Sequence, residues 1–136
     1  MIINNHPIKV YYRDIDQMGI VYYSRYLEYF EEGRTELLNQ IGLDVPSIEK
    51  KGILLPVITS HCDYKVGLKL EQEIIIESSI KKFPKATLHI DYKVLNSTNK
   101  EIMAVGYTKH AFLNNLGKPI RVPKFILNTL KINGLL

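Results

Sequence analysis

Two carboxylates, Asp14 and Asp16, lie where an alternating, strand-like segment gives way to a helix. The first N–H groups of a helix have no acceptor inside it, and they lie at the positive end of the helix dipole. They can therefore hold an oxyanion that develops on a carbonyl. A carboxylate one loop away could attack that carbonyl or activate water for the attack. An Asp before a helix is also a common turn or capping residue, so the residues alone leave both interpretations open.

The elements on either side of these carboxylates can be predicted from periodicity. Residues 8–13 alternate like a half-buried strand. Ser24 is a candidate N-cap for a helix of about 18 residues, or about 27 Å, that ends at Gly42. One face of this helix carries residues at spacings of three and four, namely Tyr26, Phe30, Gly33, Leu37 and Ile41. Gly33 on that face predicts the close approach of another backbone.

The remaining chain is mostly strand. After a loop at 43–55 with a helical turn from Pro46 to Lys51, the predicted strands are Val57–Lys65, Glu73–Lys81, a cleanly alternating segment at Leu88–Val94, and Ile102–Leu113. A short helix is expected at Pro123–Leu130. This order predicts an α+β domain over residues 1–136, with an antiparallel sheet of about five strands beside one long helix. The helix can bury its apolar face only against the concave face of that sheet.

Composition excludes several classes of protein. The chain has 136 residues, 46% of them hydrophobic and 24% charged, which is ordinary for one globular domain. The net charge of +4 is scattered, so it suits an anionic small molecule better than nucleic acid. Cys62 is the one cysteine, and the four histidines show no metal-binding spacing, so neither a disulfide nor a metal is expected. Without a secretory signal or an apolar run long enough to span a membrane, a cytoplasmic location follows by default.

Residues 14–26 resemble the signature of the 4-hydroxybenzoyl-CoA thioesterase branch of the hotdog superfamily, and of the related Tol-Pal-associated acyl-CoA thioesterases. The shared pattern is Asp-x-Asp-x-x-Gly-aliphatic-Val-aromatic, then Tyr or His, then x-x-Tyr. The matching residues are Asp14, Asp16, Gly19, Ile20, Val21, Tyr22, Tyr23 and Tyr26. The helix segment 29–36 and weaker matches around 55–57, Tyr64, 106–112 and 117–123 extend the resemblance over nearly the whole chain. It implies a hotdog fold whose sheet wraps around the helix, and hydrolysis of an acyl-CoA to free acid and CoA without a cofactor.

The resemblance also implies roles for particular residues. Asp16 falls on the catalytic carboxylate, as nucleophile or general base, and the backbone N–H of Tyr23 on the group that polarises the thioester carbonyl. Gly19 and Val21 are carried over as substrate-binding positions, and Asp14 as a structural one. Tol-Pal-associated members commonly have His at the position of Tyr23, so the backbone donor is the safer expectation here.

Assembly and CoA binding are likewise implied by the resemblance. The family works as dimers of hotdogs, often paired into tetramers, with active sites at the subunit interface. CoA phosphates rest on surface Lys or Arg in the family, and Lys82 and Lys85 in the turn 81–85 are the candidates here. A solvated hairpin is the competing interpretation for these lysines.

Two other functions compete with thioester hydrolysis. A hotdog hydratase or dehydratase would need a His paired with a carboxylate, and the chain has neither a His-Phe-Pro-Gly string nor a suitable Asp-to-His spacing before the helix. A catalytically silent hotdog that binds acyl-CoA or acts as a scaffold is opposed only by the intact Asp16. The acyl group remains open, because the tyrosines around the loop suit an aromatic acyl group and core filling equally well.

Overall fold

The protein was analysed as a computed structural model that describes all 136 residues. Its elements, in chain order, are β1 (Ile2–Lys9), the 3₁₀ turn η1 (Tyr12–Asp14), α1 (Tyr23–Gln40), α2 (Val45–Lys50), β2 (Val57–Tyr64), β3 (Glu73–Ile80), β4 (Thr87–Asn96), β5 (Ile102–Ala111) and α3 (Lys124–Ile132). No helix is long and apolar enough to cross a membrane.

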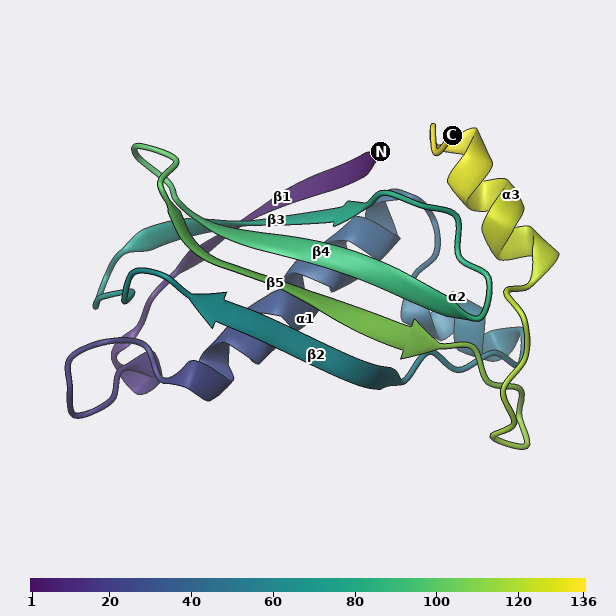
Figure 1. The fold of residues 1–136 in the computed structure, drawn as a ribbon, viewed down its shortest axis with the longest axis horizontal. Coiled ribbons are helices and arrows are strands. Elements are labelled where there is room, and N and C mark those ends of the chain that lie inside the picture. The colour runs from purple at the N-terminus through teal and green to yellow at the C-terminus, as the bar shows by residue number, and fades with distance from the viewer.

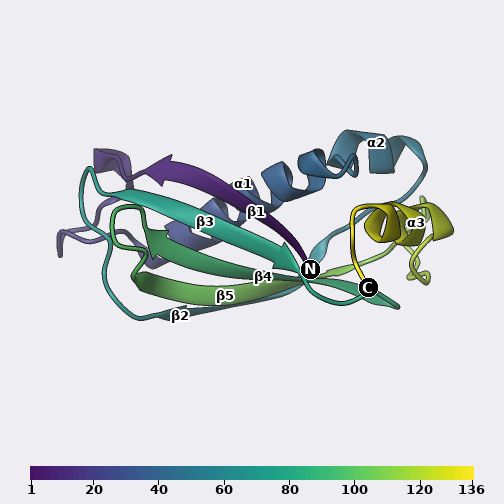
Figure 2. The same cartoon turned by 90° about the horizontal axis from the view of Figure 1, so that it is seen from above.

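The five strands form one antiparallel sheet in the order β1-β3-β4-β5-β2. Helix α1 lies along one face of this sheet, which curves beside it (Figures 1 and 2). The loop between η1 and α1 lies at one end of the molecule, and α2 and α3 lie at the other (Figure 1). The predicted α+β arrangement, with about five strands around one long helix, is therefore confirmed.

The apolar stripe of α1 faces the sheet as its periodicity predicts. Its side chains bury against alternate residues of the central strands, and the five positions Tyr26, Phe30, Gly33, Leu37 and Ile41 are all buried. The ring of Phe30 stacks on that of Tyr92 with centroids 4.3 Å apart. A Cβ added at Gly33 would lie 2.5 Å from Ser78 Oγ and 2.7 Å from Ile76 Cγ2. The close approach at Gly33 is thus real, but side chains of β3 make it, and the backbone that we predicted does not.

The first strand differs from the prediction. It runs from Ile2 to Lys9, because its whole length pairs with β3, from Ile2 opposite Ile80 to Lys9 opposite Glu73. Beyond Val10 the chain turns away, since the Asp14 carboxylate accepts a hydrogen bond from the Tyr11 N–H at 3.0 Å and closes η1. Residues 11–13 therefore belong to a turn, and the carboxylates do not continue a strand.

The start of α1 also differs from the prediction. Tyr22 is the N-cap and Ser24 lies inside the first turn, so Ser24 does not cap the helix. The physical reason is that the Tyr22 N–H is already bonded to the Asp14 carbonyl at 2.9 Å, which fixes Tyr22 as the last extended residue. The end of the helix follows the prediction, with Gly42 at a positive φ of 78° just beyond it.

Strand β2 is unusual because nearly all of it is exposed. It lies at one edge of the sheet and pairs only with β5. Seven of its eight residues are exposed, including the apolar side chains of Val57, Ile58 and Tyr64. Its second edge presents unpaired backbone groups, a feature that proteins tend to cover or to pair.

Candidate active site

The loop that carries Asp16 is held as a small two-stranded ladder. Ile15 and Val21 form an isolated antiparallel bridge. On one side of it the Asp16 N–H donates to the Ile20 carbonyl at 2.9 Å, and on the other the Tyr22 N–H donates to the Asp14 carbonyl at 2.9 Å. This ladder joins Asp16 through backbone hydrogen bonds to the first residues of α1.

The Asp16 side chain closes a turn within this loop. Its Oδ1 atom accepts hydrogen bonds from the N–H groups of Met18 at 2.7 Å and Ile20 at 3.5 Å. Gly19 supplies the positive φ of 81° that the turn requires. No protein donor contacts the Oδ2 atom, and the residue is only partly buried. Asp16 therefore does act as a turn residue, which was one of the two interpretations open from the sequence. This turn leaves its second carboxylate oxygen available.

The start of α1 offers two unpaired donors. The N–H groups of Tyr23 and Ser24 have no acceptor in the protein, whereas that of Arg25 is bonded to the Tyr22 carbonyl at 2.9 Å. The Tyr64 ring lies 4.8 Å from the Tyr23 ring, and its hydroxyl donates to the Tyr23 carbonyl at 3.4 Å. The expected proximity of Tyr64 to the site is confirmed.

Asp14 has a different environment from Asp16. It is 5% exposed, and its Oδ2 atom accepts from the Tyr11 N–H while Oδ1 lies 3.7 Å from Arg25 Nε. The same Arg25 also donates to the Arg13 carbonyl at 3.2 Å. Both oxygens of Asp14 are thus engaged in holding the end of β1 against α1.

The structure separates the other predicted site residues. Gly19 is exposed at the tip of the loop, whereas Val21 is 1% exposed and its N–H donates to the Leu68 carbonyl at 2.9 Å. Lys82 and Lys85 are exposed in the turn between β3 and β4, at the opposite end of the molecule from Asp16 (Figure 1). One chain therefore brings Asp16, Gly19 and Tyr23 together, and it does not bring the two lysines to them.

A cavity of about 630 Å³ opens between α1, α2 and the edge of the sheet. Its volume falls in the range of small-molecule sites. Six of the 13 residues that line it are hydrophobic, including Val57 at the start of β2, and Arg34 and His110 are among the polar ones. Neither Asp16 nor Tyr23 lines this cavity or the other main surface hollows.

His110 belongs to a buried hydrogen-bonded chain on β5. Its Nδ1 atom donates to the Leu55 carbonyl at 3.2 Å, so in the neutral ring Nε2 accepts from Thr108 Oγ1 at 2.8 Å. The Tyr92 hydroxyl lies 2.6 Å from the same Thr108 oxygen. Burial, opposed by the bond to Leu55 and assisted by the charge of Arg34, lowers the pKa of His110 to about 4.

Sequence analysis missed the part that Arg34 plays. The Arg34 guanidinium lies 4.0 Å from Glu31. Its side chain is only 18% exposed, however, and lines the large cavity. The sequence spacing could have indicated that Arg34 faces the interior, because it lies four residues after Phe30 and three before Leu37, both on the buried stripe.

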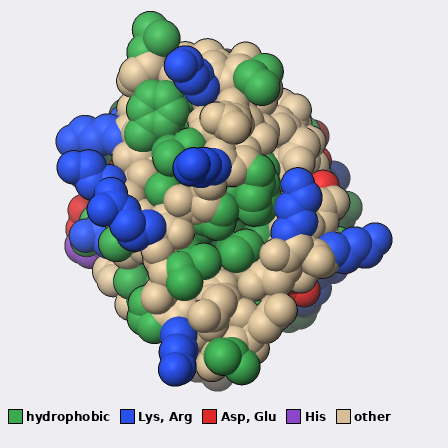
Figure 3. Space-filling view, turned by 90° about the vertical axis from the view of Figure 1, so that its right-hand side faces the viewer, with side chains coloured by type: hydrophobic (Ala, Val, Ile, Leu, Met, Phe, Trp, Pro, Cys, Tyr) green, Lys and Arg blue, Asp and Glu red, His purple; other side chains and the backbone are tan.

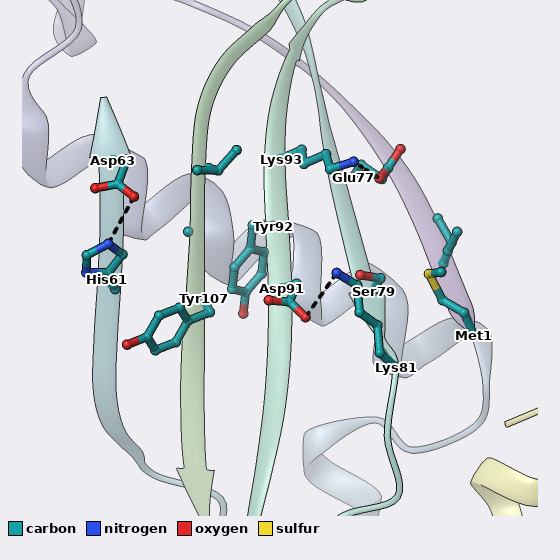
Figure 4. Close-up of a pocket in the computed structure, with 13 residues that line it drawn as sticks. Met1, His61, Asp63, Glu77, Ser79, Lys81, Asp91, Tyr92, Lys93 and Tyr107 are labelled. Carbon is teal, nitrogen blue, oxygen red and sulfur yellow. Dashed lines mark ion pairs between the residues drawn. The ribbon is translucent and has the colours of Figure 1, made fainter. Parts of the chain in front are cut away.

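A second hollow, of about 440 Å³, lies on the outer face of the sheet, away from α1 (Figure 4). The Tyr107 ring stacks between two imidazoles there, with centroids 5.3 Å from His61 and 4.9 Å from His89. His61 pairs with Asp63 at 3.2 Å and His89 with Asp91 at 3.0 Å, so the charged groups satisfy one another. Asp63 lines this outer hollow.

Cys62 does not add a nucleophile to the site. Burial raises the pKa of Cys62 to about 11, which keeps it a thiol at neutral pH. His61 is engaged with Asp63 on the outer face, so the two neighbours do not form a nucleophile pair. No group of three or more His, Cys, Asp or Glu side chains is arranged to hold a metal ion.

The fold is shared with solved thioesterases. The crystal structure of a DHNA-CoA thioesterase from Staphylococcus aureus matches it with a TM-score of 0.85 at 23% identity, covering 100% of this chain and 97% of that one. A five-stranded antiparallel sheet around one long helix, with a loop ahead of that helix, defines a hotdog-fold protein.

Sequence comparison identifies the family. An acyl-CoA thioesterase, YbgC, of Haemophilus influenzae is 31% identical over 121 residues, which cover 87% of each chain. A putative esterase of Aquifex aeolicus is 30% identical over 125 residues, covering 90% of this chain and 94% of that one. A family model described as the thioesterase-like superfamily matches residues 10–130. The chain belongs to this superfamily and is a thioester hydrolase.

Proposed function

We propose that the protein hydrolyses acyl-CoA thioesters to a free acid and CoA, with Asp16 as the reacting carboxylate. One observation carries the assignment. The partly buried Asp16 keeps its Oδ2 atom without a protein partner, on the same backbone ladder that leads to the unpaired N–H groups of Tyr23 and Ser24. The acyl-CoA substrate is suggested by the similarity to YbgC of Haemophilus influenzae. We also infer that residues 1–136 form one thioesterase domain, and a cytoplasmic location stays a prediction.

Two routes lead to the same products. In the first, Asp16 Oδ2 attacks the thioester carbonyl carbon, and the oxyanion accepts from the Tyr23 N–H. The C–S bond then breaks, CoA leaves as a thiolate that takes up a proton, and water hydrolyses the mixed anhydride. In the second, Asp16 takes a proton from water as the water attacks the same carbon, and the C–S bond then breaks to release CoA as a thiolate that takes up this proton. The turn through Met18 and Ile20 fixes the carboxylate in both routes.

We further propose that the complete site needs a second copy of the chain. Antiparallel pairing of β2 with β2 of another copy would satisfy its free edge. The two-fold axis would then place the Val57 end, and the cavity beside it, next to Tyr64 of the second copy. Because Tyr64 contacts Tyr23, the cavity of one copy would face the Asp16 loop of the other. The acyl group would occupy this cavity, while Gly19 and Val21 shape the loop and Lys82 and Lys85 contact the CoA phosphates.

The test is turnover of short, long and aromatic acyl-CoAs by the unchanged protein, Asp16→Asn and Asp14→Asn. Removing the Asp16 charge removes both nucleophile and base, so kcat should fall by roughly 10²–10⁴, with substrate binding retained. Asp14→Asn is the matched control and should cost stability more than rate. Near-normal turnover by Asp16→Asn on the best substrate would refute the assignment. Loss of turnover in a folded Asp14→Asn variant would move the reaction to the other carboxylate.

The competing function is a silent acyl-CoA-binding or scaffold protein, and the turn at Asp16 is the observation that favours it. In that case Asp16 only shapes the loop, through its bonds to Met18 and Ile20. The unchanged protein would then bind acyl-CoAs without hydrolysing any of the panel, and Asp16→Asn would bind them equally well. Calorimetric binding measured alongside turnover separates the two functions.

A further inference from the structure

The positive charge of the protein is concentrated at one end. Eight of the 18 Lys and Arg residues lie there with only two of the 14 Asp and Glu residues, so this end carries six net positive charges and the rest of the chain two net negative ones. We name this surface the basic end, and it consists of Lys50, Lys51, Lys82, Lys85, Lys118, Arg121, Lys124 and Lys131. All eight residues are exposed. Lys and Arg residues that are scattered along the sequence thus lie together at one end of the folded chain.

Four separate segments converge to make the basic end. Lys51, after α2, places its Nζ 4.3 Å from the centre of the Phe125 ring on α3. The carbonyl of Lys85, in the turn between β3 and β4, accepts from the Val122 N–H at 2.8 Å. The segment before α3 returns to the start of β2 through bridges of Leu113 with Leu54 and Pro119. The surface is therefore continuous across elements far apart in the sequence.

The charges of the basic end have no carboxylate partners within the chain. None of its eight side chains takes part in an ion pair. The two acidic residues at this end are Asp44 and Glu49. Asp44 caps α2, where its Oδ2 accepts from the Ser47 N–H at 3.2 Å and the Ser47 hydroxyl at 2.8 Å. The lysines on the sheet differ, since Lys81 pairs with Asp91 and Lys93 with Glu77.

Apolar side chains protrude among these charges. Leu116 is 79% exposed and Ile132 is 83% exposed, two and one residues from Lys118 and Lys131. Figure 3 shows an area of hydrophobic side chains at this end, bordered by Lys and Arg with few acidic groups. An acyl-CoA needs only a few cations for its phosphates, so Lys82 and Lys85 leave six further charges without a role.

We infer that the basic end docks the protein on an anionic lipid bilayer. Lys and Arg residues near an anionic membrane attract it through its surface potential, and apolar side chains beside them can enter the headgroup region. A broad surface with unpaired cations around protruding Leu116 and Ile132 fits both requirements. Within one chain, the loop with Asp16 lies at the opposite end of the molecule (Figure 1). The inference does not depend on which thioester is cleaved.

The experiment measures cosedimentation of the full chain with vesicles. Vesicles of phosphatidylglycerol mixed equally with phosphatidylcholine should bind the protein, and vesicles of phosphatidylcholine alone should not. Binding should weaken as salt screens the charges. The variant Lys118→Gln/Lys124→Gln/Lys131→Gln should bind roughly 100-fold more weakly, on the basis of about fivefold per lysine. Its turnover of soluble acyl-CoA and its melting temperature should be unchanged.

A matched variant removes the same charge elsewhere. Lys9→Gln/Lys65→Gln/Lys69→Gln also loses three exposed lysines, and it should keep its vesicle binding. Equal weakening in both variants would overturn the inference, because net charge alone would then explain the attraction. So would absence of binding by the unchanged protein, or its full displacement by free CoA, which would make the basic end a CoA site only.

The apolar side chains distinguish lipid from an acidic protein partner. Leu116→Gln/Ile132→Gln should weaken vesicle binding while leaving binding to polyglutamate unchanged. The unchanged protein could instead bind polyglutamate as tightly as vesicles, and this variant could bind vesicles as well as the unchanged protein does. Those two results together would assign the basic end to an acidic protein and overturn the lipid assignment.

Discussion

Asp14 and Asp16 have the same chemistry and lie two residues apart, yet their surroundings give them different tasks. Asp14 is buried, with the Tyr11 N–H on one oxygen and Arg25 beside the other. Asp16 uses only Oδ1 within its own loop. A carboxylate with both oxygens engaged holds structure, whereas one with a free oxygen can react. This difference is the reason for placing the chemistry on Asp16.

His110 predicts a pH dependence of stability. Its pKa is about 4 in the folded protein, below the usual value of about 6.5. Between these values the unfolded chain binds more protons than the folded one, so the free energy of unfolding falls as pH drops from 6.5 to 4. The loss from this residue is at most about 3 kcal/mol.

Urea unfolding at several pH values measures this effect. His110→Gln should be less stable at neutral pH, because the bonds to Thr108 and Leu55 are disturbed, and its stability should change less between pH 6.5 and 4. Parallel pH curves for both proteins would show that other groups cause the acid sensitivity.

The proposed contacts of Lys82 and Lys85 with the CoA phosphates can be tested separately. Lys82→Gln/Lys85→Gln should raise KM several-fold with little change in kcat, because phosphate contacts are equal in the ground and transition states. The increase should shrink at high salt. The control is Lys65→Gln/Lys69→Gln, which makes the same charge change near the other end of the molecule. Equal KM values for all three proteins would show that Lys82 and Lys85 do not contact CoA and belong to a solvated hairpin.

At the scale of elements, the joint between β1, η1 and α1 positions the reactive loop. Arg25 on the first turn of α1 reaches back to the Asp14 carboxylate and the Arg13 carbonyl. Its NH1 atom also pairs with Glu28 at 2.7 Å, and this hydrogen bond, followed by the charge of Glu28, raises the Arg25 pKa. One guanidinium thus ties the helix to the turn before the loop.

Removing this tie should destabilise the protein. Arg25→Gln leaves the buried Asp14 carboxylate without its cation, and a loss of about 1–3 kcal/mol in the free energy of unfolding is expected. Glu28→Gln breaks only the exposed pair and should cost less than about 1 kcal/mol. Chemical denaturation compares the two variants, and a loss for Glu28→Gln as large as that for Arg25→Gln would show that Asp14 does not depend on Arg25.

In the molecule as a whole, β2 is an edge strand with one side that no strand of the same chain pairs. Its free edge and its exposed apolar side chains lie next to a cavity that Val57 helps to line. Pairing of two β2 strands would cover the edge and would bring that cavity to the Asp16 loop of the second copy. Assembly and catalysis are therefore linked in this proposal.

We predict a homodimer, or a homotetramer built from such dimers, and a dependence of assembly on β2. Because Val57 would lie next to Tyr64 of the second copy, Ile58→Asp places a carboxylate opposite Asp63 of that copy. This like-charge contact should shift the protein toward monomer, with loss of turnover. Ile132→Asp makes the same change at an exposed apolar residue outside β2 and should keep the assembly. Light scattering at micromolar concentration provides the measurement, and a stable monomer of the unchanged protein would contradict the prediction.

Much of the fold was predictable from local patterns in the sequence. The apolar stripe from Tyr26 to Ile41 has a helical period and the alternation around Ile90 a strand period, so each indicates its element without knowledge of its neighbours. The segment from Asp14 to Tyr26 likewise indicated the loop and the helix start. Misplaced boundaries, at Ser24 and at residues 11–13, came from hydrogen bonds between the Asp14 peptide or side chain and residues several positions away.

Only the tertiary structure decided which distant residues meet. The burial of Arg34 beside His110 depends on the packing of α1 against β5, and the basic end depends on four segments separated by up to eighty residues. Sheet register and helix packing determine such contacts, and both are settled by the burial of the whole core. The sequence by itself therefore determined the elements and the carboxylate loop, while the fold determined the cavity, the free edge and the distribution of charge.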